Sequence, residues 1–133
     1  MFQEWGVCVV NFVIKEKIYN IPLFILIGTW DEYNEQLHKK YKIERKEQKN
    51  YGGEATFYTG DGSSLCSIWL PQFDISCIAD ITDLVHEIDH ISQYIMEHFD
   101  IPILTGRSNH AYIYLKEYFT VQTLTKLKRL SNG

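Results

Sequence analysis

The sequence predicts an α+β fold, in which a small, mostly antiparallel sheet packs against helices. In the first half of the chain, short runs of β-branched and aromatic residues alternate with turn residues, as is typical of strands. In the second half, apolar residues recur at helical spacing over two longer segments. The 133 residues, of which 45% are hydrophobic, suffice for one buried core, and no linker-like stretch divides them. We therefore expect a single domain over residues 1–133.

The first elements expected are two strands and a helix. Trp5–Val13 and Ile21–Gly28 are rich in strand-forming residues, and a polar turn region between them allows them to pair. Residues 29–32, TWDE, have the S/T-x-x-E form of a capping box, which predicts a helix start at Thr29. The apolar side of this helix is formed by Trp30, Tyr33, Leu37 and Tyr41.

A loop and a hairpin follow. Glu44–Glu54 contains an asparagine and a pair of glycines, which favours a loop. The sequence GDG at residues 60–62 then separates Ala55–Thr59 from Leu65–Leu70, and this arrangement is a strong hairpin signal. An edge strand beside the next helix would offer free backbone groups to an extended peptide, and we take Ser64–Leu70 as the candidate.

The next predicted helix carries the pentapeptide HEIDH at residues 86–90. Four residues are slightly more than one helical turn, so His86 and His90 lie one above the other and can direct ring nitrogens at one ion. Glu87 points about 100° around the helix from His86, where its carboxylate can approach a metal-bound water without being a ligand. Zinc lowers the pKa of such a water to about 7, and a nearby carboxylate can accept its proton. The motif therefore predicts a hydrolytic Zn2+ site with Glu87 as general base; the alternative is a chance occurrence on a solvated face.

The limits of this helix follow from its flanks. Asp80 is the expected N-cap, and Asp83 would lie at the third helical position. The helix should end near Asp100, because Pro102 disfavours helical geometry at the residue before it.

A catalytic zinc site needs a third protein ligand, and His110 is the candidate. It lies in the first turn of a second helical pattern that begins near residues 107–109. The first helix carries the chain roughly 14 Å past His90, whereas the eight-residue connection from Asp100 to Arg107 can span about 26 Å, so the chain can return to the metal. The alternative is that His110 is a cap or a surface histidine.

The run from HEIDH through residues 108–115, SNHAYIYL, resembles a group of small zincin-like proteins common in phage genomes, which carry HExxH followed by E-A-Y-A-Y-L. The resemblance extends loosely over residues 18–125, and the spacing also resembles that of thermolysin-like peptidases. It implies a minimal zincin-like domain with His86 and His90 as ligands and Glu87 as general base. This chain has His110 where those proteins have glutamate, and three neutral imidazoles would leave the ion with its full charge.

Tyr112 and Tyr114 share the second helix with His110, and either could donate a hydrogen bond to a developing oxyanion. The alternative is that both are amphipathic residues at the edge of the core. Cys8, Cys66 and Cys77 form no CxxC pair, which fits reduced thiols in a cytosolic chain better than disulfides.

Charge and hydropathy restrict the partners. A net charge of −4 argues against a nucleic acid, which requires clustered positive charge. No run reaches the roughly 18 apolar residues of a membrane span, and the N-terminus does not resemble a signal peptide. We expect a cytoplasmic protein, in the host cytoplasm if phage-encoded, that acts on a peptide or protein substrate. The oligomeric state is open.

The function expected is thus that of a zinc metallopeptidase. A different class of function is a non-catalytic zinc-binding module, for example a phage accessory or inhibitor protein that contacts another protein. A third interpretation has no metal, with the histidines titrating independently.

Overall fold

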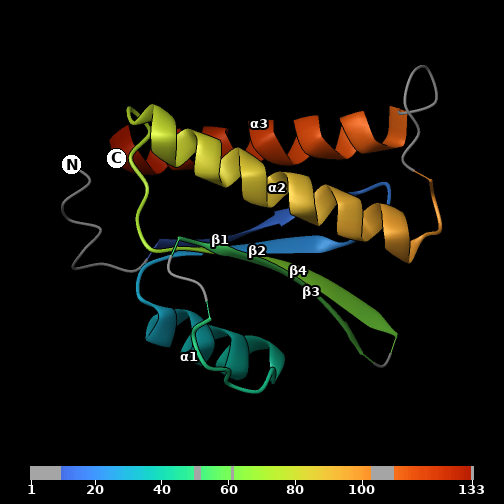
Figure 1. Cartoon of the computed structure of the whole chain (residues 1–133), viewed down its shortest axis with the longest axis horizontal. Coiled ribbons are helices and arrows are strands. Elements are labelled where there is room, and N and C mark those ends of the chain that lie inside the picture. The colour runs from blue at the N-terminus through green and yellow to red at the C-terminus, as the bar shows by residue number, and fades with distance from the viewer. Residues whose placement is uncertain (1–9, 50–51, 61, 103–109, 133) are drawn as a thin grey trace.

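The protein is described by a computed structural model over residues 10–49, 52–60, 62–102 and 110–132. Its four strands form one sheet in the order β1-β2-β4-β3, with bounds β1 Val10–Lys15, β2 Pro22–Ile27, β3 Glu54–Gly60 and β4 Ser63–Leu70. The three helices are α1 Trp30–Tyr41, α2 Ile78–His98 and α3 His110–Asn132. Helices α2 and α3 lie side by side over one face of the sheet, and α1 covers the other face (Figure 1). The α+β class is confirmed.

The sheet is mixed. Strands β1 and β2 pair antiparallel, as predicted, and β3 and β4 form the predicted antiparallel hairpin. The central pair β2 and β4 is parallel, with Leu23 opposite Cys66 and Ile27 opposite Leu70. The parallel pair arises because the chain crosses from β2 to β3 through α1, so that the hairpin joins the sheet by its second strand.

Strand β4 is therefore interior, and the edge strand beside α2 is β3. The prediction that Ser64–Leu70 is an edge strand is wrong. The hairpin pattern alone does not reveal which of its two strands meets β2. Leu65–Leu70 is buried at every position, as expected for a strand covered on both faces.

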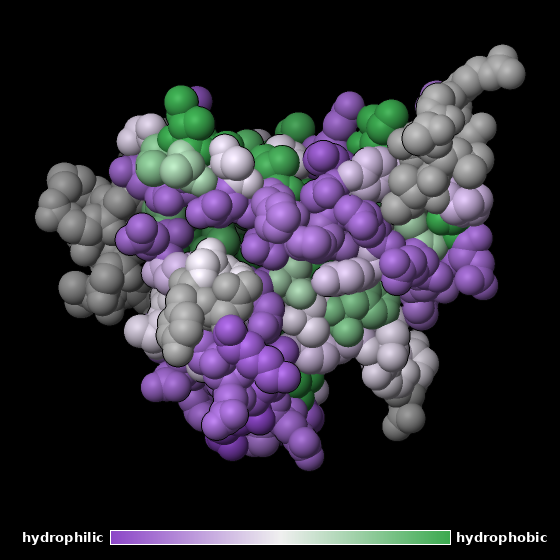
Figure 2. All heavy atoms as spheres, viewed as in Figure 1, coloured by the Kyte–Doolittle hydropathy of each residue, from purple (hydrophilic) through white to green (hydrophobic). Residues whose placement is uncertain are grey.

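Alternating residues of β2 fill the two cores. Leu23, Ile25 and Ile27 face α2 and α3, whereas Phe24 and Leu26 face α1. In the view of Figure 2 the outer surfaces of α1 and α2 are predominantly hydrophilic, whereas that of α3 also carries hydrophobic patches. None of the helices in the described residues is long and apolar enough to cross a membrane.

Helix α1 begins as predicted. The Thr29 hydroxyl accepts a hydrogen bond from the backbone N–H of Glu32, and the Glu32 carboxylate accepts one from the backbone N–H of Thr29, which completes the capping box. Lys42 ends the helix with a left-handed backbone conformation.

Helix α2 begins earlier than predicted. Cys77 is the N-cap and makes no side-chain cap bond, whereas Asp80 lies within the first turn. The Asp80 carboxylate instead accepts a hydrogen bond from the backbone N–H of Asp74, which fixes the chain before the helix. The helix ends at His98 with Phe99 as C-cap, close to the predicted position.

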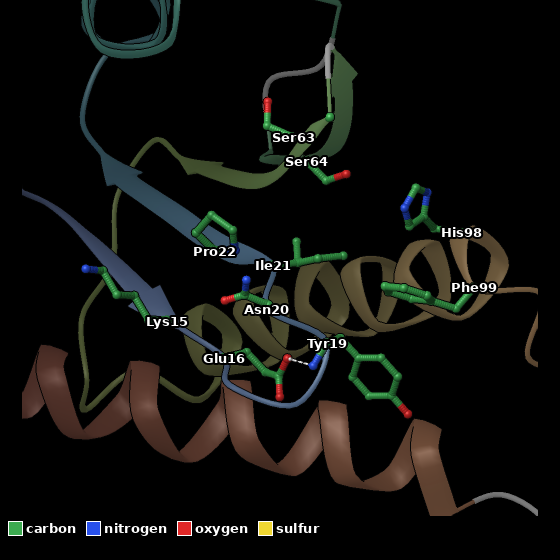
Figure 3. A pocket seen from close by; sticks show the side chains of 11 residues that line it. Lys15, Glu16, Tyr19, Asn20, Ile21, Pro22, Ser63, Ser64, His98 and Phe99 are labelled. Atoms are coloured by element: carbon green, nitrogen blue, oxygen red, sulfur yellow. Dashed lines mark hydrogen bonds between the residues drawn. The ribbon is translucent and has the colours of Figure 1, made fainter.

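The turn between β1 and β2 is held by a buried carboxylate, that of Glu16. It accepts hydrogen bonds from the backbone N–H groups of Ile18 and Tyr19, the latter drawn in Figure 3. The Tyr114 hydroxyl of α3 donates a third, at 2.6 Å. Because these bonds satisfy the charge of a carboxylate that is 2% exposed, Glu16 ties α3 to the sheet.

Candidate metal centre

Helix α2 brings His86 and His90 together. Their Nε2 atoms are 3.1 Å apart, and the two rings lie edge to face with centroids 4.6 Å apart. His86 is exposed and His90 half-buried, so the pair lies at the surface of the protein. The helical spacing predicted from the sequence is confirmed.

The separation of the two nitrogens fits a zinc site. With zinc–nitrogen bonds of about 2.0–2.1 Å and a tetrahedral angle of about 109°, two imidazole nitrogens on one ion lie about 3.3–3.4 Å apart. The observed 3.1 Å differs from this by a few tenths of an ångström. The same separation also suits a hydrogen bond between one protonated and one unprotonated ring nitrogen.

Glu87 lies beside this pair and is buried. Its side chain faces the start of β3, where Oε2 lies 3.4 Å from the position that a Cβ at Gly53 would occupy. Burial raises the pKa of the Glu87 carboxyl, and Asp83 and Glu54 raise it further, while His86 and His90 lower it. A buried carboxylate next to two imidazoles has the environment of a proton acceptor.

Gly53 makes this placement possible. It adopts a φ of 135°, and a Cβ here would also lie 3.2 Å from Leu70 Cδ2 and 3.3 Å from the Trp69 carbonyl oxygen. Only glycine takes this conformation readily. The predicted loop therefore ends in a residue whose lack of a side chain leaves space for the Glu87 carboxylate.

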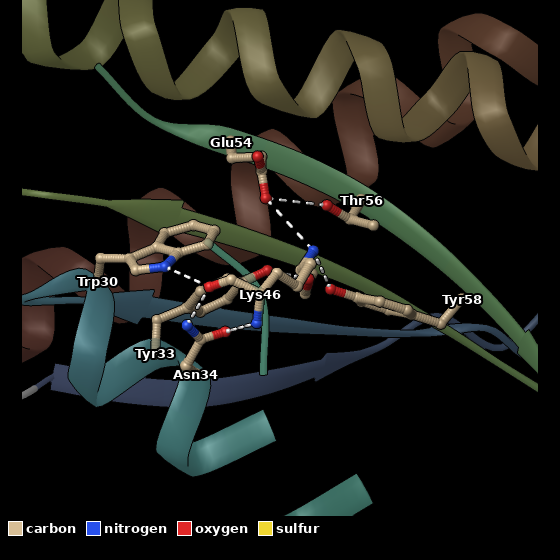
Figure 4. A network of polar contacts seen from close by, with 8 residues as sticks. Trp30, Tyr33, Asn34, Lys46, Glu54, Thr56 and Tyr58 are labelled. Atoms are coloured by element: carbon tan, nitrogen blue, oxygen red, sulfur yellow. Dashed lines mark hydrogen bonds and ion pairs between the residues drawn. The ribbon is translucent and has the colours of Figure 1, made fainter. Parts of the chain in front are cut away.

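Lys46, which follows α1, has polar contacts with both α1 and β3, as Figure 4 shows. The Lys46 carbonyl accepts hydrogen bonds from Trp30 Nε1 and Asn34 Nδ2, and its Nζ donates to the Tyr58 hydroxyl at 2.7 Å. Nζ also pairs with Glu54 at 3.4 Å. These bonds hold Lys46 against α1 and β3.

Tyr94, which the sequence did not indicate as a candidate, also lies beside the pair. Its ring lies nearly parallel to that of His90, at 18° with centroids 6.1 Å apart. Burial raises the pKa of the Tyr94 hydroxyl, with smaller contributions from Glu87, Glu97 and Glu54. The signal in the sequence is its position four residues after His90, on the same stripe of the helix.

His110 does not join the pair. It is the exposed first residue of α3, whose buried Leu115 and Phe119 follow it by five and nine residues. At 100° per residue these lie about 140° and 180° around the helix from His110, so His110 is on the side of α3 away from the core. Within the described ranges, no three His, Cys, Asp or Glu side chains are grouped as they would be around a metal ion.

The two candidate tyrosines have other partners. The Tyr112 hydroxyl donates to Asp89, which also accepts from Gln93 Nε2 and lies 3.4 Å from Lys116 Nζ. The Tyr114 hydroxyl donates to Glu16 at the β1–β2 turn. The Tyr112 bond holds α3 against α2, at a residue of the pentapeptide HEIDH, and the Tyr114 bond holds α3 against the sheet. Neither hydroxyl is hydrogen-bonded to His86 or His90.

The cysteines within the described residues are free thiols. Cys66 is fully buried in the core under α2, and burial raises the pKa of its thiol. Cys77 is partly buried at the start of α2. Cys8 lies outside the described residues.

No protein-family model, no curated protein and no solved structure matches this chain.

Proposed function

We propose that this protein is a zinc-dependent metallopeptidase of the HExxH type, with His86 and His90 as metal ligands and Glu87 as general base. The observation that carries the proposal is the convergence of two Nε2 atoms to 3.1 Å, close to the separation required on one tetrahedral zinc, with a buried carboxylate one residue away.

The chemistry divides between the ion and the chain. A bound zinc ion supplies an acidified water and a Lewis acid that polarises a carbonyl. With the ion bound, the Glu87 carboxylate would serve as the proton acceptor for its water, and partial burial, which raises the pKa of this carboxyl, makes it a stronger base than a solvated glutamate. The backbone at Gly53 and the ring of Tyr94 border this carboxylate and His90, respectively.

An extended peptide is the substrate class that the surroundings favour. Strand β3 is the edge of the sheet next to α2, and an edge strand offers backbone donors and acceptors to another chain. Figure 2 shows a paler, less hydrophilic surface over the β-hairpin, between the hydrophilic surfaces of α2 and α1. Ala55 and Phe57 of β3 are only partly buried, so they can contact such a peptide.

The proposal needs a third protein ligand. The sequence offers His110 for this role. To act as a ligand, the side chain of His110 must turn toward α2 when the metal binds. This requirement makes His110 the residue that separates the proposed peptidase from its alternative.

The decisive variant is Glu87→Gln, assayed with a mixture of fluorescence-quenched peptides in the presence of zinc. We expect turnover to fall by about 100-fold or more, while bound zinc per chain stays the same. Glu97→Gln, an exposed glutamate on the same helix, is the matched control and should leave turnover unchanged. Equal turnover of the wild type and Glu87→Gln would disprove the catalytic role.

A non-catalytic zinc-binding module is the second candidate. It is favoured by the absence of a third ligand group beside His86 and His90 in the residues that the structure describes. In this case zinc would bind, the peptides would not be cleaved, and His110→Ala would leave zinc affinity unchanged.

A further inference from the structure

Two hollows adjoin at the end of the sheet where β2 and β4 begin. The first, of about 580 Å3, lies among the β1–β2 turn, the start of β4 and the C-terminal end of α2 (Figure 3). The second, of about 460 Å3, lies among the end of α1 and the β3–β4 hairpin. Pro22, Ser63 and Ser64 line both hollows, which therefore form one groove around the end of the sheet.

The strand register leaves a gap in this groove. On one side, β4 is paired with β3 from Ser63 onward. On the other side, it is paired with β2 only from Cys66 onward, so that Ser63, Ser64 and Leu65 have no partner residue in β2. On the β2 side, Pro22 has no N–H, and Asn20 with a φ of 58° turns the chain out of the strand direction. The first residues of β4 thus extend past β2 like a short edge strand.

A chain that filled the gap would continue the line of β2. Its side chains would alternate between the two hollows, as Leu23 and Phe24 alternate between the two cores. One set would meet the apolar hollow beside α1, where the lining includes Tyr41, Ile43 and Tyr58. The other set would meet the polar hollow.

The polar hollow favours acidic side chains. His98 and Asn20 offer hydrogen-bond donors there, and Ser63 and Ser64 add hydroxyl groups. Lys15 also lines the hollow, with its ammonium group directed away from His98 (Figure 3). Among the described residues that line it, the carboxylate is that of Glu16, which is already engaged with two backbone N–H groups and Tyr114. Lys42 lines the second hollow, so the described lining residues of the groove together carry positive charge, opposite in sign to the net charge of −4 of the whole chain.

We propose that this groove binds an extended peptide segment of a partner protein in which acidic and apolar residues alternate, added as a strand beside Ser63 and Ser64. The acidic side chains enter the hollow with Lys15 and His98, and the apolar side chains enter the hollow with Ile43 and Tyr58. The pairing is β-strand addition with one pocket for each side of the added strand.

The groove is separate from the histidine pair. His98 follows His90 by eight residues, which is about 12 Å along α2. Gly53 and Glu87 lie at the opposite end of the β3–β4 hairpin from Ser63. The proposal therefore does not rest on zinc binding or on peptide hydrolysis.

The test titrates the 15N-labelled protein with a capped hexapeptide of alternating Glu and Leu. We expect saturable shifts of the Ser63 and Ser64 amide resonances, and much weaker binding of a peptide of the same composition with its three Glu and three Leu in separate blocks. Two further peptides carry N-methyl groups on alternate residues, one on the odd and one on the even positions, so that each lacks the N–H groups of one edge. The peptide that lacks the N–H groups facing β4 should bind much more weakly than the unmethylated peptide.

Charge reversal supplies the second measurement. Lys15→Glu should weaken the alternating peptide about threefold to tenfold, whereas Lys39→Glu, an exposed lysine of α1 outside the groove, should not. The proposal would be overturned if the Ser63 and Ser64 amide resonances did not shift, or if the block peptide bound as tightly as the alternating peptide. It would also be overturned if both N-methylated peptides bound as tightly as the unmethylated one.

Discussion

The middle of α2 and the first turn of α3 both present histidines, but only α2 assembles a pair. His86 and His90 meet because a helix places residues four apart on one face, whatever the helix packs against. The position of His110 depends instead on the rotation of α3, which Tyr112 and Tyr114 hold through Asp89 and Glu16. Local spacing thus determines two ligands of the proposed site, whereas packing between distant elements determines the third.

The largest effect is expected at the pair. His86→Ala or His90→Ala should lower zinc affinity by more than about 100-fold, because each removes half of the ligands that α2 supplies. Competition with a chromophoric chelator measures this on protein without a histidine tag. His98→Ala, on the same helix but remote from the pair, is the control and should bind zinc as the wild type does. Unchanged affinity in both pair variants would show that α2 holds no metal.

His110→Ala tests whether α3 supplies the third ligand. If His110 turns inward as the peptidase proposal requires, its loss should reduce zinc affinity by about tenfold to 100-fold and reduce turnover with it. The same competition assay measures the affinity. Wild-type affinity and turnover in this variant would remove His110 from the site.

The anchor of α3 should affect stability more than metal binding. Tyr114→Phe should lower the free energy of unfolding by about 1.5 kcal/mol, because Glu16 loses a charge-assisted hydrogen bond. Urea denaturation measures the change. A Tyr114 variant with unchanged stability would mean that the position of α3 does not depend on this bond.

The same tyrosine predicts a pH dependence. Burial, together with the hydrogen bond to Glu16, raises the pKa of Tyr114 to about 12 from its ordinary value of 10.0. A raised pKa of an acid stabilises the folded state while the hydroxyl is protonated, so this contribution is present below pH 10 and is lost as the pH rises toward 12. Tyr114→Phe should reduce the slope of stability against pH in that window. An unchanged slope would contradict the assignment.

Much of the fold could be predicted because its signals are local. The capping box at Thr29 and the glycines at 60–62 specify a helix start and a hairpin within a few residues. Two features could not be predicted, namely the parallel pairing of β2 with β4 and the interior position of β4. Both depend on which strand of the hairpin pairs with β2, and no local pattern indicates this.

The candidate site divides in the same way. The spacing of HEIDH predicted the pair and the neighbouring carboxylate, whereas Gly53 is distant from Glu87 in the sequence and comes near it only in the folded protein. The hydrogen bonds of Tyr112 and Tyr114 join residues 23 and 98 positions apart in sequence, and no local pattern indicates them.

The central claim is that His86 and His90 hold zinc. Anomalous diffraction at the zinc edge, from crystals of untagged protein grown with zinc, tests it most directly. We predict a peak about 2.0–2.1 Å from Nε2 of both residues, with the Glu87 carboxylate beside it but not coordinated. A map with no peak at the pair, and the two rings still in direct hydrogen-bond contact, would contradict the account.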